Sequence, residues 1–276
     1  MLLIIDGNNI FARIFFAFLS EIENSPFYAI DGVLAYIENV CRDYQPTHLV
    51  VTWDSPILKR REEYPAYKAD RKPKPEGFIK QLTALRDVVK GTQLAQAEAS
   101  GYEADDVIYT LSSLLAFEEQ VLVLTSDRDL LQVVRDDQVT VELLRFEPHT
   151  HRTLRDRFNT LAEVEATVGV KSRQIPSLKG LAGDSDNLPH PAGIGHVWAK
   201  RLLGDYNDVA SIYHHLDEVE PERIRRLLET GRQQAFLGES LARLRLAPIG
   251  FWLEDARTPD LRKLRAEAAR LVALTQ

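Results

Sequence analysis

The chain has almost no cysteine and begins with only a short apolar run. Cys41 is the one cysteine among 276 residues, which excludes a small fold held together by disulfides. The apolar run from Met1 to Ile5 ends at Asp6 and lacks a basic flank, so it is too short for a signal peptide or a membrane span. We therefore expect a cytoplasmic protein with no membrane partner.

An excess of positive charge is also missing. The chain has 34 Lys and Arg residues against 41 Asp and Glu residues, a formal net charge of −7. Nucleic-acid-binding domains are usually basic, so an evenly spread charge of this sign would argue against one. Hydrophobic residues make up 45% of the chain, which excludes disorder and fits one large or two smaller globular domains. The placement of the charges must therefore decide the functional class.

Three apolar runs predict buried parallel strands. They are Leu2–Ile5, His48–Trp53 and Val121–Thr125. Helical patterns over 32–44 and 104–116 separate them, and strands that alternate with helices predict a parallel sheet covered on both faces. An acid follows each run: Asp6, Asp54 and Asp127. Because the carboxyl ends of parallel strands border the ligand crevice of such a fold, we expect these acids to share one site.

Further acids occur in three short motifs. Asp127 and Asp129 are two residues apart at a strand end, and Glu103 and Asp106 share one face of a predicted helix with Asp105 beside it. Together with Asp184 and Asp186 the predicted cluster contains nine carboxylates: Asp6, Asp54, Glu103, Asp105, Asp106, Asp127, Asp129, Asp184 and Asp186. Without these nine, 34 basic residues face 32 acidic ones, so the remainder of the protein is mildly basic.

A cluster of this size requires cations. Two carboxylates about 4 Å apart repel each other by roughly 4 kcal/mol at an effective dielectric constant near 20. Oxygen ligands without His or Cys select Mg²⁺ or Mn²⁺ over zinc. A pair of such ions is the arrangement that hydrolyses phosphodiesters by in-line displacement. The acids therefore predict two Mg²⁺ (or Mn²⁺) ions and phosphodiester hydrolysis.

The rest of the chain predicts a basic insertion and a helical module. Residues 59–90 contain ten Lys or Arg against five Asp or Glu around a Pro-rich centre, which predicts a mobile, basic segment. Beyond about residue 165 the patterns are helical: Val197–Leu203, Asn207–Leu216, Pro221–Thr230, Gly231–Leu244 and a terminal amphipathic helix over Leu261–Leu274.

Five motifs resemble, in order, those of the structure-specific 5′ nucleases, the flap endonucleases and 5′–3′ exonucleases of phages and bacteria. They are Ile5–Asn9, Tyr67–Arg71, Tyr102–Asp106, Thr125–Leu130 and Gly183–Pro189, the last followed by Gly193-Ile194-Gly195. The resemblance covers about residues 1–250. It implies an α/β fold: a PIN-like parallel-sheet nuclease domain (1–165) with a helical arch (59–90), then a helix-hairpin-helix type DNA-binding module (166–250) and a helical tail (251–276).

The resemblance also implies a role for each site residue. Asp6, Asp54, Glu103, Asp105 and Asp106 would hold one metal ion, and Asp127, Asp129, Asp184 and Asp186 the other. Lys68 and Arg71 would contact the scissile phosphate and, with Asp106, are the predicted catalytic residues. The predicted DNA contacts are Arg13, Arg60, Tyr67, Lys68, Arg71, Gly193, Gly195, Lys200 and Arg201. Tyr67 offers a ring for an unpaired base, and the glycines allow backbone N–H groups to approach a phosphate.

The resemblance implies a monomeric enzyme acting on DNA with a 5′ flap, a nick or a 5′ end, with an RNA–DNA hybrid as a further partner. The sequence leaves two rivals open: a PIN-type ribonuclease, which would lack the arch and the hairpin module, and a non-cleaving DNA-junction binding protein. A phosphatase of the haloacid-dehalogenase type would need an Asp where Asn8 stands.

The chain departs from the family pattern in its last acidic motif. Only Ser185 separates Asp184 from Asp186, where the family has two residues, and His190-Pro191 replaces the usual Gly-Val. Because one residue spans up to about 3.5 Å, one of the two acids must be displaced. The segment from Asp186 to Gly195 keeps the family's length, so we expect Asp186 to stay beside Asp127 and Asp129 and Asp184 to move away.

Overall fold

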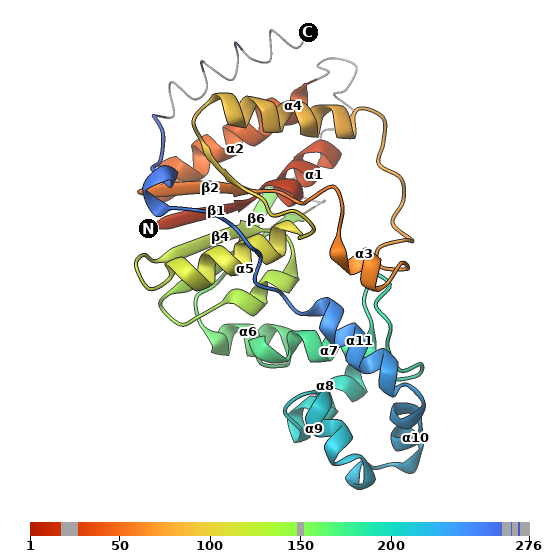
Figure 1. Cartoon of the computed structure of the whole chain (residues 1–276). Coiled ribbons are helices and arrows are strands. Elements are labelled where there is room, and N and C mark those ends of the chain that lie inside the picture. The colour runs from red at the N-terminus through yellow and green to blue at the C-terminus, as the bar shows by residue number, and fades with distance from the viewer. Residues whose placement is uncertain (18–26, 148–151, 261–265, 267–269, 271–276) are drawn as a thin grey trace.

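The computed structural model describes residues 1–17, 27–147, 152–260, 266 and 270 (Figure 1). A six-stranded sheet runs in the order β3-β2-β1-β4-β5-β6. Its strands are β1 (Leu2–Asp6), β2 (His48–Thr52), β3 (Ala95–Ala97), β4 (Val121–Thr125), β5 (Val139–Glu147) and β6 (Arg152–Phe158). Neighbouring strands are parallel, except that β5 and β6 are antiparallel. The three strands predicted from apolar runs form the centre of this sheet.

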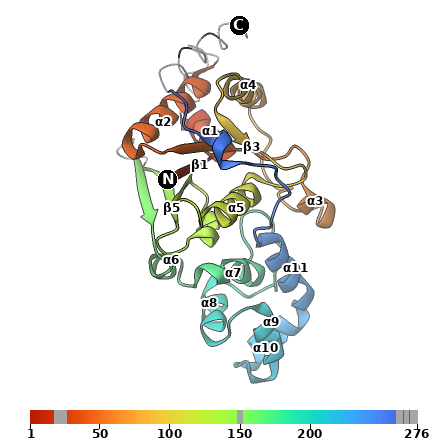
Figure 2. The same ribbon diagram turned by 60° about the vertical axis from the view of Figure 1, so that its left-hand side comes forward.

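The alternation of side chains along β1 explains the two layers of helices. Leu3 and Ile5 face a core formed with α1 (Gly7–Ala17), α2 (Tyr28–Tyr44) and α4 (Phe78–Gly91). Leu2 and Ile4 face a second core on the other side, formed with α5 (Ala104–Leu115). Figure 2 shows the sheet between these layers. The predicted parallel-sheet α/β fold covered on both faces is confirmed.

A helical module follows the sheet domain. Its helices are α6 (Leu161–Val168), α7 (Ile175–Ala182), α8 (His196–Asp205), α9 (Val209–His214), α10 (Glu222–Thr230) and α11 (Arg232–Ala242), with short 3-10 turns at η3 (Ser172–Gln174) and η4 (Leu216–Glu218). The core that covers one face of the sheet continues into this module, through residues such as Leu181 and Ala235. The module is therefore packed onto the sheet domain, as Figure 1 shows.

Two glycines allow α7 and α11 to pack closely. A Cβ atom added at Gly180 would lie 2.5 Å from the backbone nitrogen of Glu239, and one added at Gly238 would lie 2.1 Å from the carbonyl oxygen of Pro189. Real Cβ atoms do not come so close to their neighbours, so a larger side chain would push α11 away from α7 at Gly180 and away from the segment after α7 at Gly238. This contact fixes α7, and hence the acidic segment that follows it.

The basic insertion differs from the prediction of a mobile segment over 59–90. It begins with α3 (Lys59–Glu63), and its second part is α4, which buries Phe78, Leu85 and Val88 against the core. The apolar side chains at helical spacing in α4 outweigh its basic ones, which face solvent. The part of the insertion outside the core is therefore limited to about residues 59–77.

The C-terminal segment returns along the molecule. It crosses from α11 to the amino end of β2. There η5 (Leu253–Ala256) lies near β2, and the backbone N–H of Thr258 donates to the carbonyl of Thr47. The predicted helix over Leu261–Leu274 lies almost entirely outside the described residues. In the part of the chain that is described, no helix has the length and apolar character needed to cross a membrane.

Candidate active site

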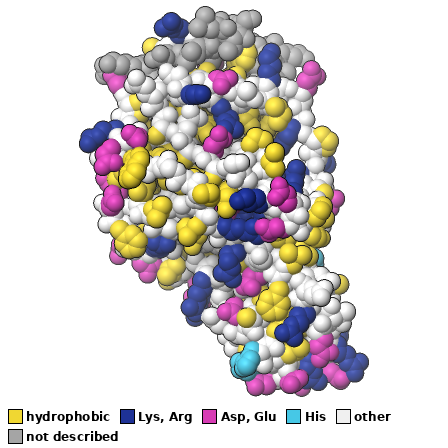
Figure 3. Space-filling model, viewed as in Figure 1, with side chains coloured by type: hydrophobic (Ala, Val, Ile, Leu, Met, Phe, Trp, Pro, Cys, Tyr) yellow, Lys and Arg dark blue, Asp and Glu magenta, His cyan; other side chains and the backbone are white. Residues whose placement is uncertain are grey.

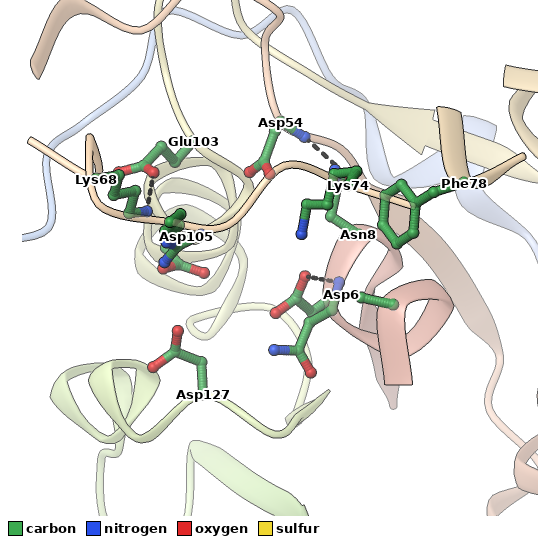
Figure 4. Close-up of a pocket in the computed structure, with 12 residues that line it drawn as sticks. Asp6, Asn8, Asp54, Lys68, Lys74, Phe78, Glu103, Asp105 and Asp127 are labelled. Atoms are coloured by element: carbon green, nitrogen blue, oxygen red, sulfur yellow. Dashed lines mark hydrogen bonds and ion pairs between the residues drawn. The ribbon is translucent and has the colours of Figure 1, made fainter. Parts of the chain in front are cut away.

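A cavity of about 220 Å³ opens at the carboxyl ends of the central strands. Register explains its position, because Asp6 pairs with Thr52 and Ile5 with Leu124, so the acids that end β1 and follow β2 and β4 lie at one edge. Its lining, shown in Figure 4, contains five carboxylates and three basic side chains: Asp6, Asn8, Asn9, Ala12, Asp54, Lys68, Arg71, Lys74, Phe78, Glu103, Asp105 and Asp127. The expectation that strand-end acids share a site therefore agrees with the geometry.

Three of these carboxyl groups have raised pKa values. Burial raises the pKa of Asp6 to about 7, with a further contribution from Asp54 and Asp127, against a hydrogen bond from Thr125 Oγ1 at 2.7 Å. Burial, followed by the charges of Asp127 and Asp6, raises the pKa of Asp105 well above its usual value. Burial likewise raises that of Asp54, although the backbone N–H of Ala104 donates to it at 2.8 Å. The cavity therefore carries negative charge that the described residues do not neutralise.

This shift predicts how stability depends on pH without divalent metal. A carboxyl whose pKa is raised on folding binds its proton more tightly in the folded state, so its contribution is present below the unfolded pKa and lost as pH rises through the folded one. We expect the free energy of unfolding to fall by a few kcal/mol between about pH 4 and pH 7, and Asp6→Asn to reduce that slope. Urea denaturation at several pH values in EDTA measures this, with the exposed Asp87→Asn as control. An unchanged slope in Asp6→Asn would contradict the raised pKa.

Glu103 differs from the other cavity acids because it has cationic partners. Lys68 forms an ion pair with Glu103, the Tyr67 hydroxyl donates to it at 2.9 Å and Arg60 Nη1 donates at 3.0 Å. Burial raises its pKa, but Lys68 and Arg60 together bring the pKa below its usual value. Lys68 has a φ of 55°, in the left-handed region that non-glycine residues seldom adopt, and its N–H donates to the carbonyl of Asp186 at 2.9 Å. A non-glycine residue with a positive φ is often found at functional sites.

Asp106 is not brought to the cavity, although the resemblance makes it a metal ligand and catalytic residue. Its side chain is 1% exposed, and both of its oxygens accept hydrogen bonds from the Arg60 guanidinium. The backbone N–H of Arg245 also donates to it, at 2.9 Å. On a helix of 3.6 residues per turn, Asp105 and Asp106 point in directions about 100° apart. Asp105 faces the cavity, and Asp106 joins α5 to α3 and to the segment after α11.

Two predicted DNA contacts are buried. Arg60 is 4% exposed and its guanidinium is held by Asp106, Glu103 and two backbone carbonyls. Tyr67 is 5% exposed, and its hydroxyl donates to Glu103. Burial in carboxylate contacts removes both side chains from the surface that a nucleic acid could reach. The resemblance implied both as DNA contacts, and the sequence does not reveal which members of a basic run are paired.

Of the other predicted DNA contacts, Lys68 and Arg71 line the cavity, while Arg13 lies on α1. Gly193 and Gly195 precede α8, and Lys200 and Arg201 lie on it. Arg13 does not line the cavity, and its Nε is buried without a hydrogen-bond partner among the described residues. Gly195 is the residue before α8, and an added Cβ there would meet nothing within 4 Å, so its backbone is open to a ligand. Lys200 lines a separate hollow with Arg128 and His196. The guanidinium of Arg201 lies 5.0 Å from the centre of the Trp198 ring.

The second acidic cluster lies beside the first and already contains a cation. Lys179, from α7, forms an ion pair with Asp129 and donates to Asp184 Oδ2 at 2.8 Å. Asp186 instead accepts from Arg71 Nη2 at 2.6 Å and lies 3.7 Å from Lys68 Nζ. The expected register is therefore wrong in this arrangement, since Asp184 adjoins Asp129 and Asp186 faces the insertion. The helix α7, which ends two residues before Asp184, determines the position of that acid more strongly than the loop length after it.

Several functional residues were missed. Asn8 Oδ1 accepts from the backbone of Asp54 at 2.9 Å, and Asn9 Oδ1 accepts from the backbone of Ser126 at 2.8 Å, so both tie neighbouring strand ends together. Their position two and three residues after Asp6 was a usable signal. Lys74 was visible only as part of the basic run, and a single lysine in an apolar helix gave no indication that Lys179 would meet the acids.

Comparison with known proteins gives the family. Residues 1–168 match the model described as "5'-3' exonuclease, N-terminal resolvase-like domain", and residues 170–263 match "5'-3' exonuclease, C-terminal SAM fold". DNA polymerase I of Caldicellulosiruptor bescii is 36% identical over 272 residues, which are 96% of this chain and 31% of that protein. The thermostable DNA polymerase I of Thermus filiformis is 35% identical, with the same two shares. The chain thus spans about a third of the length of these relatives.

Solved structures show the same fold. A structure of T5 5′-exonuclease with bound zinc aligns with a TM-score of 0.71 at 20% identity, over 100% of this chain and 99% of the other. Human GEN1 in complex with Holliday junction DNA aligns with a TM-score of 0.63 at 13% identity, over 99% of this chain and 68% of the other. The α/β domain followed by a helical module is thus a fold that this chain shares with both structures. The chain belongs to the 5′–3′ exonuclease family, and the resemblance seen in its motifs is confirmed.

Proposed function

We propose that this chain hydrolyses phosphodiester bonds of DNA near 5′ ends, flaps and nicks, with a divalent metal ion. The observation that carries this proposal is the lining of one cavity by five carboxylates and three basic side chains. The carboxylates suit a hard cation, and the basic side chains suit the phosphate that it would act on. Membership in a nuclease family agrees with a site that binds a divalent cation and a phosphate.

The cavity residues fit a divalent ion in chemistry and charge. Among the described residues, no three His, Cys, Asp or Glu side chains are arranged to hold a metal ion as they stand. Burial is nevertheless the main cause of the raised pKa values of Asp6, Asp54 and Asp105, so a bound cation would stabilise the ionised form of each carboxyl group. We propose that these three and Asp127 hold the ion, and that all-oxygen ligation selects Mg²⁺ or Mn²⁺. When bound, such an ion supplies Lewis-acid stabilisation and an activated water.

Three basic side chains from the insertion complete the site. Lys68, Arg71 and Lys74 line the cavity opposite the strand ends. Two of them are paired, Lys68 with Glu103 and Arg71 with Asp186. A phosphate entering the cavity would share these cations, which would orient it and stabilise the charge that its oxygens gain as the bond breaks.

The surface around the site suits a nucleic acid. On the face drawn in Figure 3, Lys and Arg side chains gather where the sheet domain meets the helical module. We propose that Gly193, Gly195, Lys200 and Arg201 contact duplex phosphates without reading sequence. Related structures support DNA as the substrate, since they include T5 flap endonuclease in a complex with DNA and metal ions and the catalytic core of Rad2 with DNA substrate. A cytoplasmic location and a monomeric state stay predictions.

One experiment tests the proposal against its rivals. The purified chain is incubated with 5′-labelled flap, nicked duplex, single-stranded DNA, RNA and RNA–DNA hybrid, each with Mg²⁺, Mn²⁺ or EDTA. We expect short 5′ products from flap and nicked DNA with either metal and none in EDTA. Preference for RNA would favour the PIN-type ribonuclease. Tight binding of the flap without cleavage in any metal would favour the junction-binding protein.

Lys68→Ala should slow the chemical step more than it weakens substrate binding. The proposed partner of Lys68 is charge that develops in the transition state, so its removal affects kcat more than KM. We expect a loss of about 10²- to 10³-fold in kcat, comparable to the removal of one preorganised charge-stabilising donor. Steady-state kinetics on the flap measure this, with Lys72→Ala, an exposed lysine outside the cavity lining, as control. A change confined to KM would assign Lys68 to ground-state binding.

A further inference from the structure

Lys179 occupies the centre of the second acidic cluster. Its ammonium lies between Asp129, with which it forms an ion pair, and Asp184, whose Oδ2 it contacts at 2.8 Å. All three side chains are largely buried, with exposed fractions of 18%, 20% and 13%. A lysine is protonated at neutral pH, and contact with two carboxylates favours its charged form. The cluster thus holds a permanent cation supplied by the chain.

The two clusters differ in how their charge is balanced. In the second cluster, Lys179 serves Asp129 and Asp184, and Arg71 serves Asp186. In the first, Asp6, Asp54, Asp105 and Asp127 take part in no salt bridge with any described residue within 4 Å. A divalent ion is therefore drawn to the first cluster, where it replaces mutual repulsion with attraction. At the second it would have to displace an ammonium that is already in place.

We infer that the Lys179 ammonium takes the place of a second divalent ion, so that the chain binds one such ion where the family resemblance predicts two. This inference rests on the proposed function, because it takes the first cluster to be the metal site. A second ion does not fit as the residues stand, since an ion between Asp129 and Asp184 would lie against a like charge.

The geometry of α7 places the base of the Lys179 side chain close to Asp184 in the sequence. Lys179 lies in the last turn of this helix and Gly183, directly before Asp184, caps it, so only the four residues 180–183 separate lysine from aspartate. Asp184 Oδ1 also accepts from the backbone N–H of Asp186 at 2.8 Å, which holds its carboxylate toward the lysine. The shortened motif therefore presents Asp184 to Lys179. Lys179 thus supplies one positive charge that is covalently attached to the chain and, unlike a metal ion, does not exchange with ions in solution.

The test counts bound ions. Free Mn²⁺ has a strong electron paramagnetic resonance signal that weakens on binding, so titration of the full chain gives the number of sites. We expect one site in the unaltered chain, with any second ion bound at least about tenfold more weakly, and two comparable sites in Lys179→Met. Lys90→Met, which removes the same charge from an exposed position on α4, should keep one site. Asp105→Asn should abolish the single site.

The outcomes separate this inference from the proposed function. Two sites of similar affinity in the unaltered chain would overturn the role of Lys179 and leave the metal-dependent function standing. That result does not depend on whether Lys179→Met folds, and Lys179→Gln offers a second variant. A single Mn²⁺ site in both Lys179→Met and Lys179→Gln, with melting temperatures like that of the unaltered chain, would also overturn the role of Lys179. Absence of any bound Mn²⁺ would overturn both.

Discussion

Replacing Asp105 with Asn should reduce cleavage of a 5′-flap DNA by about 10³-fold while leaving DNA binding nearly unchanged. Asp105 faces the cavity and has no salt bridge within 4 Å among the described residues, and its pKa is raised by burial and by Asp127 and Asp6. A metal ion contributes several kcal/mol to catalysis, and each 1.4 kcal/mol changes a rate about tenfold. Asn keeps the shape of the side chain but removes the charge that would hold the ion.

Single-turnover rates at saturating enzyme measure this loss without interference from product release. Asp87→Asn, an exposed acid on α4, is the control for a change of charge. Asp106→Asn provides the sharper comparison, because the two acids are adjacent and only Asp105 lines the cavity. A large catalytic loss in Asp106→Asn with little loss in Asp105→Asn would show that Asp106 holds the metal ion, as the resemblance implies. The assignment of the ligand role to Asp105 rather than Asp106 from the cavity lining would then be wrong.

The sequence predicted the centre of the fold better than its edges. β1, β2 and β4 are buried on both faces, so their continuous apolar runs differ clearly from the flanking sequence. β3 has only three residues, and β6 is a largely polar edge strand paired with β5, so neither produces such a run. Burial on both faces generates the signal, and it fades where a strand meets solvent.

The same limit applies to the site. Strand-end position predicted that Asp6, Asp54 and Asp127 would meet, because the sheet itself determines that edge. It could not predict which of two neighbouring acids on α5 faces the cavity, since that depends on the rotation of the helix against the core. Nor could it predict the partners of Arg60 and Lys179, which come from segments far away in sequence. The amino-acid sequence locates each charge along the chain, but tertiary packing decides which charged side chains form pairs.

Arg60 shows how strongly such pairing can matter to stability. Its guanidinium has five N–H donors, and the structure uses all of them, on Glu103, both oxygens of Asp106 and the carbonyls of Leu241 and Arg243. These contacts join α3, α5 and the end of α11. We expect Arg60→Met to lower the free energy of unfolding by about 3–5 kcal/mol, because it leaves the buried carboxylate of Asp106 without its cation and Glu103 with Lys68 alone.

Urea denaturation at neutral pH measures this change, and Arg61→Met, the exposed neighbour, is the matched control. Adding Asp106→Leu to Arg60→Met should recover part of the loss, because removal of both partners no longer leaves a buried charge unpaired. If Arg60 instead contacted DNA, Arg60→Met would weaken binding and its salt dependence while leaving the unfolding curve unchanged. A loss of less than about 1 kcal/mol, the range of exposed ion pairs, would return Arg60 to the nucleic-acid surface.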